Sequence, residues 1–497
     1  LFTLSQLPGL GPVSQLSRLR LKVKYSTALR LIDRALEEAA VELGMTSAEL
    51  EEIAVPTYGL DPDGRLREDF GPFGAELKIT GTHETELSWI KADGRTQKSV
   101  PAEVKEQHAE DFKELKRTIQ DIEKMLPAQR DRLERLLATE REWALEPWLE
   151  RYLNHPLLSQ MTRRLIWHFR LGDRTGQGIW QDGKIVDVNN QALDWLAPET
   201  RVRLWHPIGF SVETVAAWRV WLETHQTVQP FKQAHREIYV LTDAEITTNT
   251  YSNRFAGHII KQHKFAAIAK QRGWRYSLQG AFDSHNTPTL QLPHWNLSVE
   301  YWVEGTTNDL SPSGICLYLS TDQVRFCRDG QPVPLHEVPA LAFSEAMRDV
   351  DLFAGVCSIG NDPAWHDRGE NNYQTYWHNF SFGELSATAK TRKEILERLI
   401  PRLKMADRCS LSAKFLVVRG NLRNYKIYLG SANILMEPNE QYLCIVPDRG
   451  SGAKASEVFL PFEGDNTLAV IISKAFLLAA DSKIKDPSIV SQIGRTV

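Results

Sequence analysis

Cysteine is scarce in this sequence, and several familiar catalytic motifs are missing from it. The later half of the 497 residues holds all five cysteines, which form no C-x-x-C pair: Cys316, Cys327, Cys357, Cys409 and Cys444. An odd number at irregular spacings predicts buried free thiols in a reducing cytoplasm. The sequence also lacks G-x-x-x-x-G-K-[ST], a G-x-G-x-x-G after a predicted strand, G-x-S-x-G and H-E-x-x-H. Common NTPases, nucleotide-linked dehydrogenases, serine hydrolases and zincins are therefore disfavoured, and neither an enzymatic activity nor a cofactor is specified.

Long apolar segments are absent as well. The longest apolar stretch near the end, Leu468 to Ala480, is interrupted by Ser473 and Lys474 and is too short to cross a bilayer. No signal peptide is visible, so we expect a cytoplasmic protein that does not enter a membrane. The sequence starts with Leu1 rather than Met. We therefore expect it to be the C-terminal part of a larger protein.

Acidic residues are missing from Ile246 to Phe282, although this window contains six cations: Arg254, Lys261, Lys264, Lys270, Arg272 and Arg275. The whole chain has a formal charge of -4, so this window at +6 leaves about -10 for the rest. Such segregation is unfavourable unless an anion or an acidic surface offsets it. The basic window therefore predicts a surface that contacts something negatively charged.

A helix predicted from Tyr251 to Arg272 would gather the cations of this window on one side. At roughly 100° per residue, Arg254, Lys261, Lys264 and Arg272 fall within an arc of about 80°. Arg275 follows beside Trp274 and Tyr276, which offer rings for stacking against bases. This pattern favours binding of nucleic acid or another polyanion. Pairing with the protein's own carboxylates and binding of a small-molecule phosphate are the alternatives.

The length and the residue patterns predict a multidomain α+β protein. A chain of 497 residues is too long for one hydrophobic core. Residues 1–172 read as helices and a small antiparallel sheet, with a helical hairpin within Val104 to Arg151 where Pro127 ends the first helix. Residues 173–384 read as a mixed α/β region that contains the basic helix. Residues 385–497 read as a C-terminal α+β domain that opens with a helix at Ser386.

A polar loop after a predicted buried strand is the best candidate for an enzyme site. Val350 to Cys357 is mostly apolar, as expected of a strand that is covered on both faces. The following loop 361–370 contains three carboxylates and a histidine, which are suitable ligands for a hard cation or Zn²⁺: Asp362, His366, Asp367 and Glu370. This arrangement predicts, as an alternative, a metal-assisted hydrolase. An ordinary polar loop in which Asp362 caps a turn explains the same residues.

Several long segments resemble a known bacterial family: LEEIAVPTYGLDPDGRLREDFG, HPLLSQMTRRLIWHF, FAGHIIKQHKFAAIAKQRGW, NILMEPNEQYLCIVP and FLPFEGDNTLAVIISKAFLLAADSKIKDP. They are similar to MolR-type proteins, which are large, carry domain of unknown function 4132 with a separate C-terminal domain of unknown function, and often contain a WGR module. The resemblance implies the C-terminal part of a regulatory or scaffold protein in a nucleic-acid context. It provides no catalytic residues, and no WGR signature is present. A protein–protein scaffold that uses the helical hairpin is a further alternative.

Overall fold

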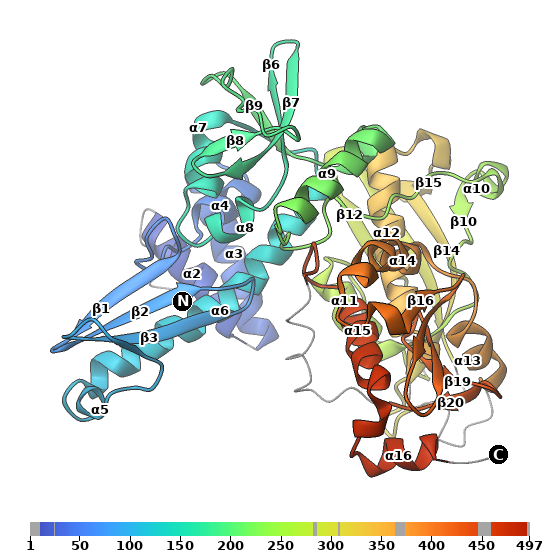
Figure 1. Cartoon of the computed structure of the whole chain (residues 1–497). Helices are drawn as coiled ribbons and strands as arrows, with labels where there is room; N and C mark the ends of the chain where they lie inside the picture. The colour runs from blue at the N-terminus through green and yellow to red at the C-terminus, as the bar shows by residue number, and fades with distance from the viewer. Residues whose placement is uncertain are drawn as a thin grey trace. The chain divides into compact units, whose positions relative to one another are not determined.

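The structure of the protein is a computed structural model that describes residues 10–23, 25–281, 286–306, 309–362, 373–445 and 459–494. Contacts divide the chain into two compact units (Figure 1). Unit 1 comprises the chain up to His206 together with Glu213–Ala234, and unit 2 comprises Pro207–Val212 together with His235–Val497. Residues 173–234 thus fall mainly in unit 1. The three predicted regions, residues 1–172, 173–384 and 385–497, stay a prediction.

Unit 1 begins with three helices. These are α2 (Leu10–Lys22), α3 (Ser26–Glu42) and α4 (Ser47–Ile53). The chain is not helical at Val23 and Tyr25, which lie between α2 and α3, and Val13 of α2 packs in one cluster with Ala40 of α3. The capping box that opens α4 is present: the Glu49 amide donates to Thr46 Oγ1 (3.2 Å), and the Thr46 amide donates to Glu49 Oε2 (2.9 Å).

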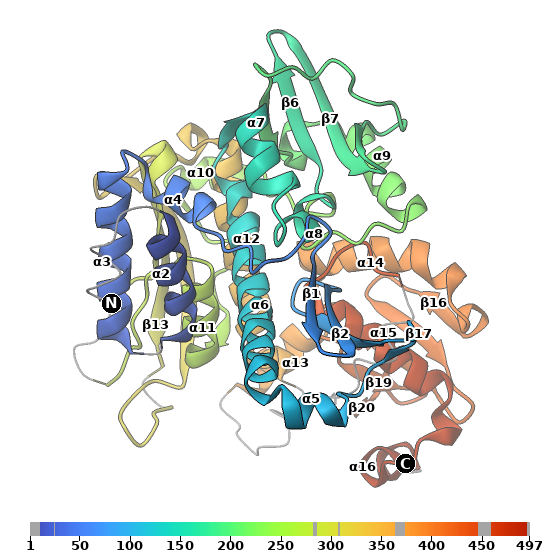
Figure 2. The same ribbon diagram turned by 90° about the vertical axis from the view of Figure 1, so that its left-hand side faces the viewer.

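The small antiparallel sheet predicted in residues 1–172 is present and packs against helices. Its strands are β1 (Arg65–Phe70), β2 (Phe73–Ile79), β3 (Thr85–Lys91) and β4 (Thr96–Gln97), hydrogen-bonded in this order. One face carries Phe70, Ala75 and Trp89, which pack against Phe112 and Leu115. The helices that cover this face are α5 (Ala102–Gln107) and α6 (Ala109–Arg135) (Figure 2).

The predicted helical hairpin is wrong, because α6 continues through Pro127 as one helix of 27 residues. A proline inside a helix removes one backbone hydrogen bond and costs about 3 kcal/mol. An apolar stripe crosses the proline without a change of period, with Ile122, Leu126 and Leu133 each buried. Burial of one such side chain contributes roughly 1.5–3 kcal/mol, so the stripe offsets the local cost. The scaffold hypothesis therefore loses the element on which it was based.

A second antiparallel sheet completes unit 1 in the order β5-β9-β6-β7-β8. Its strands are β5 (Glu142–Ala144), β6 (Trp167–Leu171), β7 (Arg174–Gln181), β8 (Lys184–Val186) and β9 (Arg201–Leu204). Two helices of four residues, α7 (Leu145–Trp148) and α8 (Ser159–Thr162), accompany it, together with a π-helical turn (Leu149–Leu153) and the longer helix α9 (Val212–Thr224). Trp148 and Trp167 meet edge to face in the core, with ring centroids 5.2 Å apart.

Unit 2 is built on a sheet with the order β10-β14-β13-β12, in which β11 and β15 also pair with β14. The strands are β10 (Tyr251–Ser252), β11 (Ile259–Lys261), β12 (Thr289–Leu292), β13 (Leu297–Gly305), β14 (Tyr318–Arg328) and β15 (Gln331–Pro332). The helices of this region are α10 (Asp243–Thr248), α11 (Gln262–Gln271) and α12 (Ala340–Cys357). Phe265 of α11 and Phe353 of α12 join Val299 and Phe326 of the sheet in one core.

Two elements expected in this part of the chain are wrong. The helix predicted from Tyr251 begins only at Gln262, because Ile259–Lys261 pair with β14 and Gly257 adopts a positive φ of 76°. The strand predicted at Val350 to Cys357 is the last part of α12. Its buried residues Val350, Phe353 and Cys357 recur every three or four positions, which is a helical period.

The remainder of unit 2 is an antiparallel meander with flanking helices. Its strands are β16 (Cys409–Leu411), β17 (Phe415–Arg419), β18 (Asn424–Tyr428), β19 (Ile434–Met436) and β20 (Gln441–Leu443), and its helices are α13 (Gln374–Ser381), α14 (Ala387–Leu399), α15 (Asn466–Ala479) and α16 (Pro487–Ile493). Ser386 caps α14 as predicted, by accepting from the Ala389 amide (3.2 Å). Helices and antiparallel sheets in several layers confirm the multidomain α+β class.

Candidate functional site

Unit 2 contains a cleft of about 460 Å³ between its central and C-terminal elements. Four segments provide most of the polar groups: the turn before β11, the helices α11 and α12, and the first turns of α14. The side chains that matter for its chemistry are Arg254, His258, Lys264, Asp351, Thr388 and Arg392. Aromatic side chains of Phe255, Phe380 and Tyr428 complete the lining. The cleft can therefore offer charges of both signs and an apolar wall.

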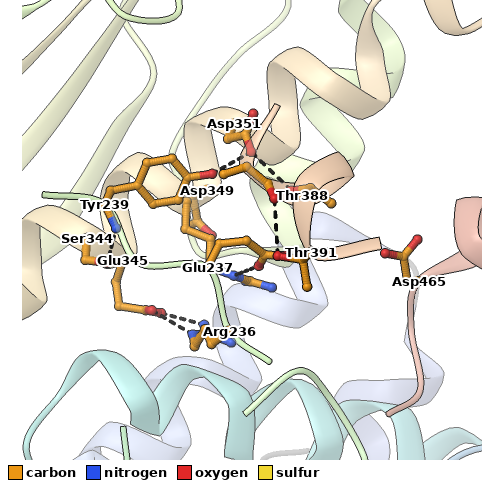
Figure 3. Close-up of polar contacts among 12 residues, drawn as sticks. Arg236, Glu237, Tyr239, Ser344, Glu345, Asp349, Asp351, Thr388, Thr391 and Asp465 are labelled. Atoms are coloured by element: carbon orange, nitrogen blue, oxygen red, sulfur yellow. Dashed lines mark hydrogen bonds and ion pairs between the residues drawn. The ribbon is translucent and has the colours of Figure 1, made fainter. Parts of the chain in front are cut away.

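Asp351 is the most deeply buried charged group of this cleft, with 6% of the residue exposed. Figure 3 shows Tyr239 and Thr388 converging on its carboxyl group. Both hydroxyls donate to the same oxygen, Oδ2, at 2.5 Å from Tyr239 and 3.1 Å from Thr388. Burial raises the pKa of Asp351 above its ordinary value. A carboxyl group held in this way can accept a further hydrogen bond or exchange a proton.

The other acids of this layer are matched by nearby cations, as Figure 3 shows in part. Glu345 binds Arg236 through two contacts of 2.7 and 2.5 Å, and both side chains are buried. Arg348 donates to Glu237 (3.0 Å). These contacts fix the segment that carries Tyr239 against α12. Asp351 lies on this same helix, next to the segment that these contacts hold in place.

Lys264 lies on α11 at the edge of the cleft. Its ammonium group donates to the Val356 carbonyl in the last turn of α12 (2.7 Å), and it forms no ion pair with any residue that the structure describes. The side chain is exposed, yet the surrounding protein atoms partly desolvate the ammonium group and lower its pKa. Of its three hydrogen-bond donors, one is used by the carbonyl.

The two arginines of the cleft are already paired. Arg254 forms an ion pair with Glu245 and donates to the Val240 carbonyl (2.8 Å). Arg392 binds both carboxylate oxygens of Asp465 through Nε, each at 3.0 Å. These arginines add positive potential to the cleft, but their carboxylate partners take up most of their hydrogen-bonding capacity.

His258 lies in a short chain of polar groups. Its Nδ1 is 3.2 Å from the Tyr376 hydroxyl, which is 2.9 Å from the hydroxyl of Ser358. Burial lowers the pKa of His258, so the ring is neutral at pH 7. Tyr376 thus holds the orientation of a neutral imidazole that can either donate or accept a hydrogen bond at the cleft.

The five cations predicted to bind a polyanion do not share one face. Arg254 precedes β11 instead of lying on a helix, so the predicted arc of four cations does not form. Carboxylates from outside the basic window neutralise two further members: Lys261 contacts Asp362 (2.5 Å) and Arg272 contacts Asp349 (2.7 Å). Arg275 is exposed beside β12. Of the five, only Arg254 and Lys264 line the cleft.

The metal site in loop 361–370 stays a prediction, because only one of its four residues lies in the described part of the chain. Asp362 forms the ion pair with Lys261, whereas His366, Asp367 and Glu370 lie outside the described residues. Because α12 precedes this loop, the expected position at the end of a strand is wrong. Within the described ranges there is no group of three or more His, Cys, Asp or Glu side chains that could hold a metal ion.

The sequence offered few signals for the residues that the structure brings together. Asp351 interrupts the apolar run Val350 to Cys357, and an acid at such a position was the one available hint. Its partners Tyr239 and Thr388 are 112 and 37 residues away in the chain, so no local pattern could connect them. Among the described residues, no helix combines the length and the apolarity that crossing a bilayer requires.

Comparisons with known proteins support the presence of two domains of unknown function, which the resemblance implied. Residues 94–274 match the Domain of unknown function (DUF4132), and residues 389–493 match the Domain of unknown function (DUF7737). The chain is also similar to the Uncharacterized protein YehI of Escherichia coli (strain K12), at 24% identity over 332 residues. This match covers 64% of the chain and 26% of the relative, so the chain spans about a quarter of that protein's length. No solved structure matches the chain.

Proposed function

We propose that unit 2 is a ligand-binding module whose cleft receives a small anion, either a phosphate ester or a carboxylate. In this proposal the chain is the binding part of a MolR-like, WGR-associated regulatory or scaffold protein of the bacterial cytoplasm. The position of Lys264 supports this proposal. Its ammonium group lines the cleft and has only a carbonyl partner among the described residues. A positive group in this position is stabilised when an anion occupies the cleft.

The first turn of α14 adds to this preference. Ser386 and Thr388 line the cleft at the beginning of a helix of 13 residues. The N-terminal end of a helix carries a partial positive charge from its unpaired backbone amides. Together with Lys264 and the paired guanidinium of Arg254, this end makes the cleft suited to one anionic group.

A small anion agrees with the ion pairs better than a nucleic acid does. A polyanion needs several unneutralised cations on a continuous surface, whereas Arg254, Lys261 and Arg272 each have a carboxylate partner. Four phosphate contacts would give a logarithmic salt slope of roughly -3 to -4 for duplex DNA. We expect no binding of this steepness, and a slope in that range, measured by fluorescence anisotropy, would favour the polyanion alternative.

Substitution of Lys264 tests the proposed function directly. We expect Lys264→Met to weaken binding of ethyl phosphate at least tenfold, which corresponds to about 1.4 kcal/mol, because the variant loses the cation that has no acidic partner. Lys270→Met is the matched control, since Lys270 is exposed on the same helix and does not line the cleft. Titration calorimetry or ligand-observed NMR measures both variants. Equal affinity in Lys264→Met and the wild type would reject the proposal.

A further inference from the structure

The cleft contains an ammonium group and a carboxyl group that have no group of opposite charge in direct contact among the described residues. Lys264 has no acidic partner among the described residues, and Asp351 has no ion pair with any described cation. The two nearby arginines already form ion pairs, Arg254 with Glu245 and Arg392 with Asp465. A ligand that satisfies both open groups carries charges of both signs.

We infer that the cleft selects an amphoteric ligand, in which an anionic group binds Lys264 and a primary ammonium group binds Asp351. This inference rests on the proposed function, and it adds the chemical class of the ligand. An amphoteric ligand differs from a simple anion because Asp351 would repel a second negative charge and would bind a hydrogen-bond donor of the ligand.

The hydrogen bonds of Asp351 support this assignment. Both hydroxyl donors, from Tyr239 and Thr388, reach Oδ2. Oδ1 accepts no hydrogen bond from the described part of the chain. Asp351 lines the cleft, with 6% of the residue exposed. A buried carboxyl group without a cation is costly, and an ammonium group of the ligand would offset that cost.

The remaining lining favours an organic ammonium ion over a metal cation. Among the described residues of the cleft, Glu384 is the other acid, and its 90% exposed side chain binds Lys414 (2.5 Å). One carboxyl group does not supply the six or more oxygen ligands that Ca²⁺ takes. The aromatic side chains of Phe255, Phe380 and Tyr428 suit instead the apolar part of an organic molecule.

Three small probes separate the two charges. Phosphoethanolamine carries both, ethyl phosphate carries the anion alone, and ethanolamine carries the ammonium group alone. We expect the full chain to bind phosphoethanolamine at least tenfold more tightly than ethyl phosphate, measured by titration calorimetry or ligand-observed NMR. Equal affinity for these two probes would overturn the inference. Failure of all three to bind at millimolar concentration would overturn both the inference and the proposed function.

Two variants assign the preference to its residue. Asp351→Asn keeps the size of the side chain and should abolish the preference for phosphoethanolamine over ethyl phosphate. Glu384→Gln, the matched control, removes the exposed acid of the same cleft and should retain the preference. Retention of the preference in Asp351→Asn would overturn the inference, and the wild-type comparison decides the question if that variant does not fold.

The outcomes for the two proposals are distinguishable. If Lys264→Met weakens both phosphate probes and Asp351→Asn changes neither, the proposed function stands and the inference fails. If Lys264→Met weakens neither, the proposed function fails. Vesicles that contain phosphatidylethanolamine identify the source of the chemistry: binding to vesicles as well as to free phosphoethanolamine indicates a lipid headgroup, and binding to the free compound alone indicates a metabolite.

Discussion

At the scale of single residues, Lys474 is buried at a cost. It lies on α15 in the C-terminal core, where its ammonium group donates to the Ala432 carbonyl (2.8 Å). Burial lowers the pKa of Lys474 from 10.5 to about 8. The folded protein therefore holds this proton less tightly than the unfolded chain, a difference of roughly 3 kcal/mol at neutral pH. This cost is largest below pH 8 and disappears as the pH rises toward 10.5.

Replacement of this lysine should stabilise the protein. We expect Lys474→Met to raise the free energy of unfolding by about 1–3 kcal/mol at pH 7, because methionine fills the site without a charge to desolvate. The gain should shrink between pH 8 and 10.5, where the lysine itself becomes neutral in the folded state. Urea unfolding at pH 7 and pH 9 measures both effects. A variant less stable than the wild type at pH 7 would contradict this account.

Individual charges also show the limit of a sequence window. The acids that neutralise Arg272 and Lys261 are Asp349 and Asp362, which lie 77 and 101 positions away in the chain. The lack of acids between Ile246 and Phe282 is real, but folding brings carboxylates from α12 and the segment after it to this window. The charge of residues 246–282 therefore indicated that these cations need acidic partners. It could not indicate which distant carboxylates would be those partners.

At the scale of elements, α12 organises unit 2. Four charged side chains of this helix each bind a segment that is distant in sequence: Glu345, Arg348, Asp349 and Asp351. The pair formed by Arg236 and Glu345 is the most enclosed, with side chains 0% and 6% exposed. Such a pair gives the helix one register against the segment that carries Tyr239.

A double-mutant cycle measures the contribution of this pair. We expect Arg236→Met or Glu345→Leu alone to lower the free energy of unfolding by about 3–5 kcal/mol, since each removes the bidentate partner of a buried charge. The double variant should lose much less than the sum, because two apolar side chains can pack together. Urea unfolding of the four proteins gives the coupling energy. Additive losses would show that the two side chains act independently.

Whole elements were predictable where caps or alternation marked them. Ser386 begins α14 at the residue that the sequence predicts. Thr46 and Asp465 likewise cap α4 and α15 through their side chains, and buried residues alternate along β13. The end of α12 was mistaken because a short apolar run fits either period. The segment before α11 was mistaken because Ile259–Lys261 pair with a strand distant in sequence and Gly257 adopts a positive φ. Tertiary pairing with β14 and burial against the sheet decided these two cases.

At the scale of the whole molecule, contacts separate unit 1 from unit 2, and each has a core of its own. We expect residues 235–497, expressed alone, to fold with one cooperative thermal transition and to bind the same phosphate probes as the full chain. Circular dichroism and calorimetry test the first point, and titration tests the second. A fragment that lacks a cooperative transition would show that unit 2 depends on unit 1.

The cleft has a consequence for how such proteins can change during evolution. Arg254 and Lys264 belong to the region that matches the first family, whereas Arg392 and Tyr428 belong to the region that matches the second. Thr388, one position before that second region, reaches across to Asp351 on α12. Neither region alone supplies the lining of the cleft. A gene that loses or exchanges one of them should lose recognition altogether, so selection on binding would keep the two inherited as a pair.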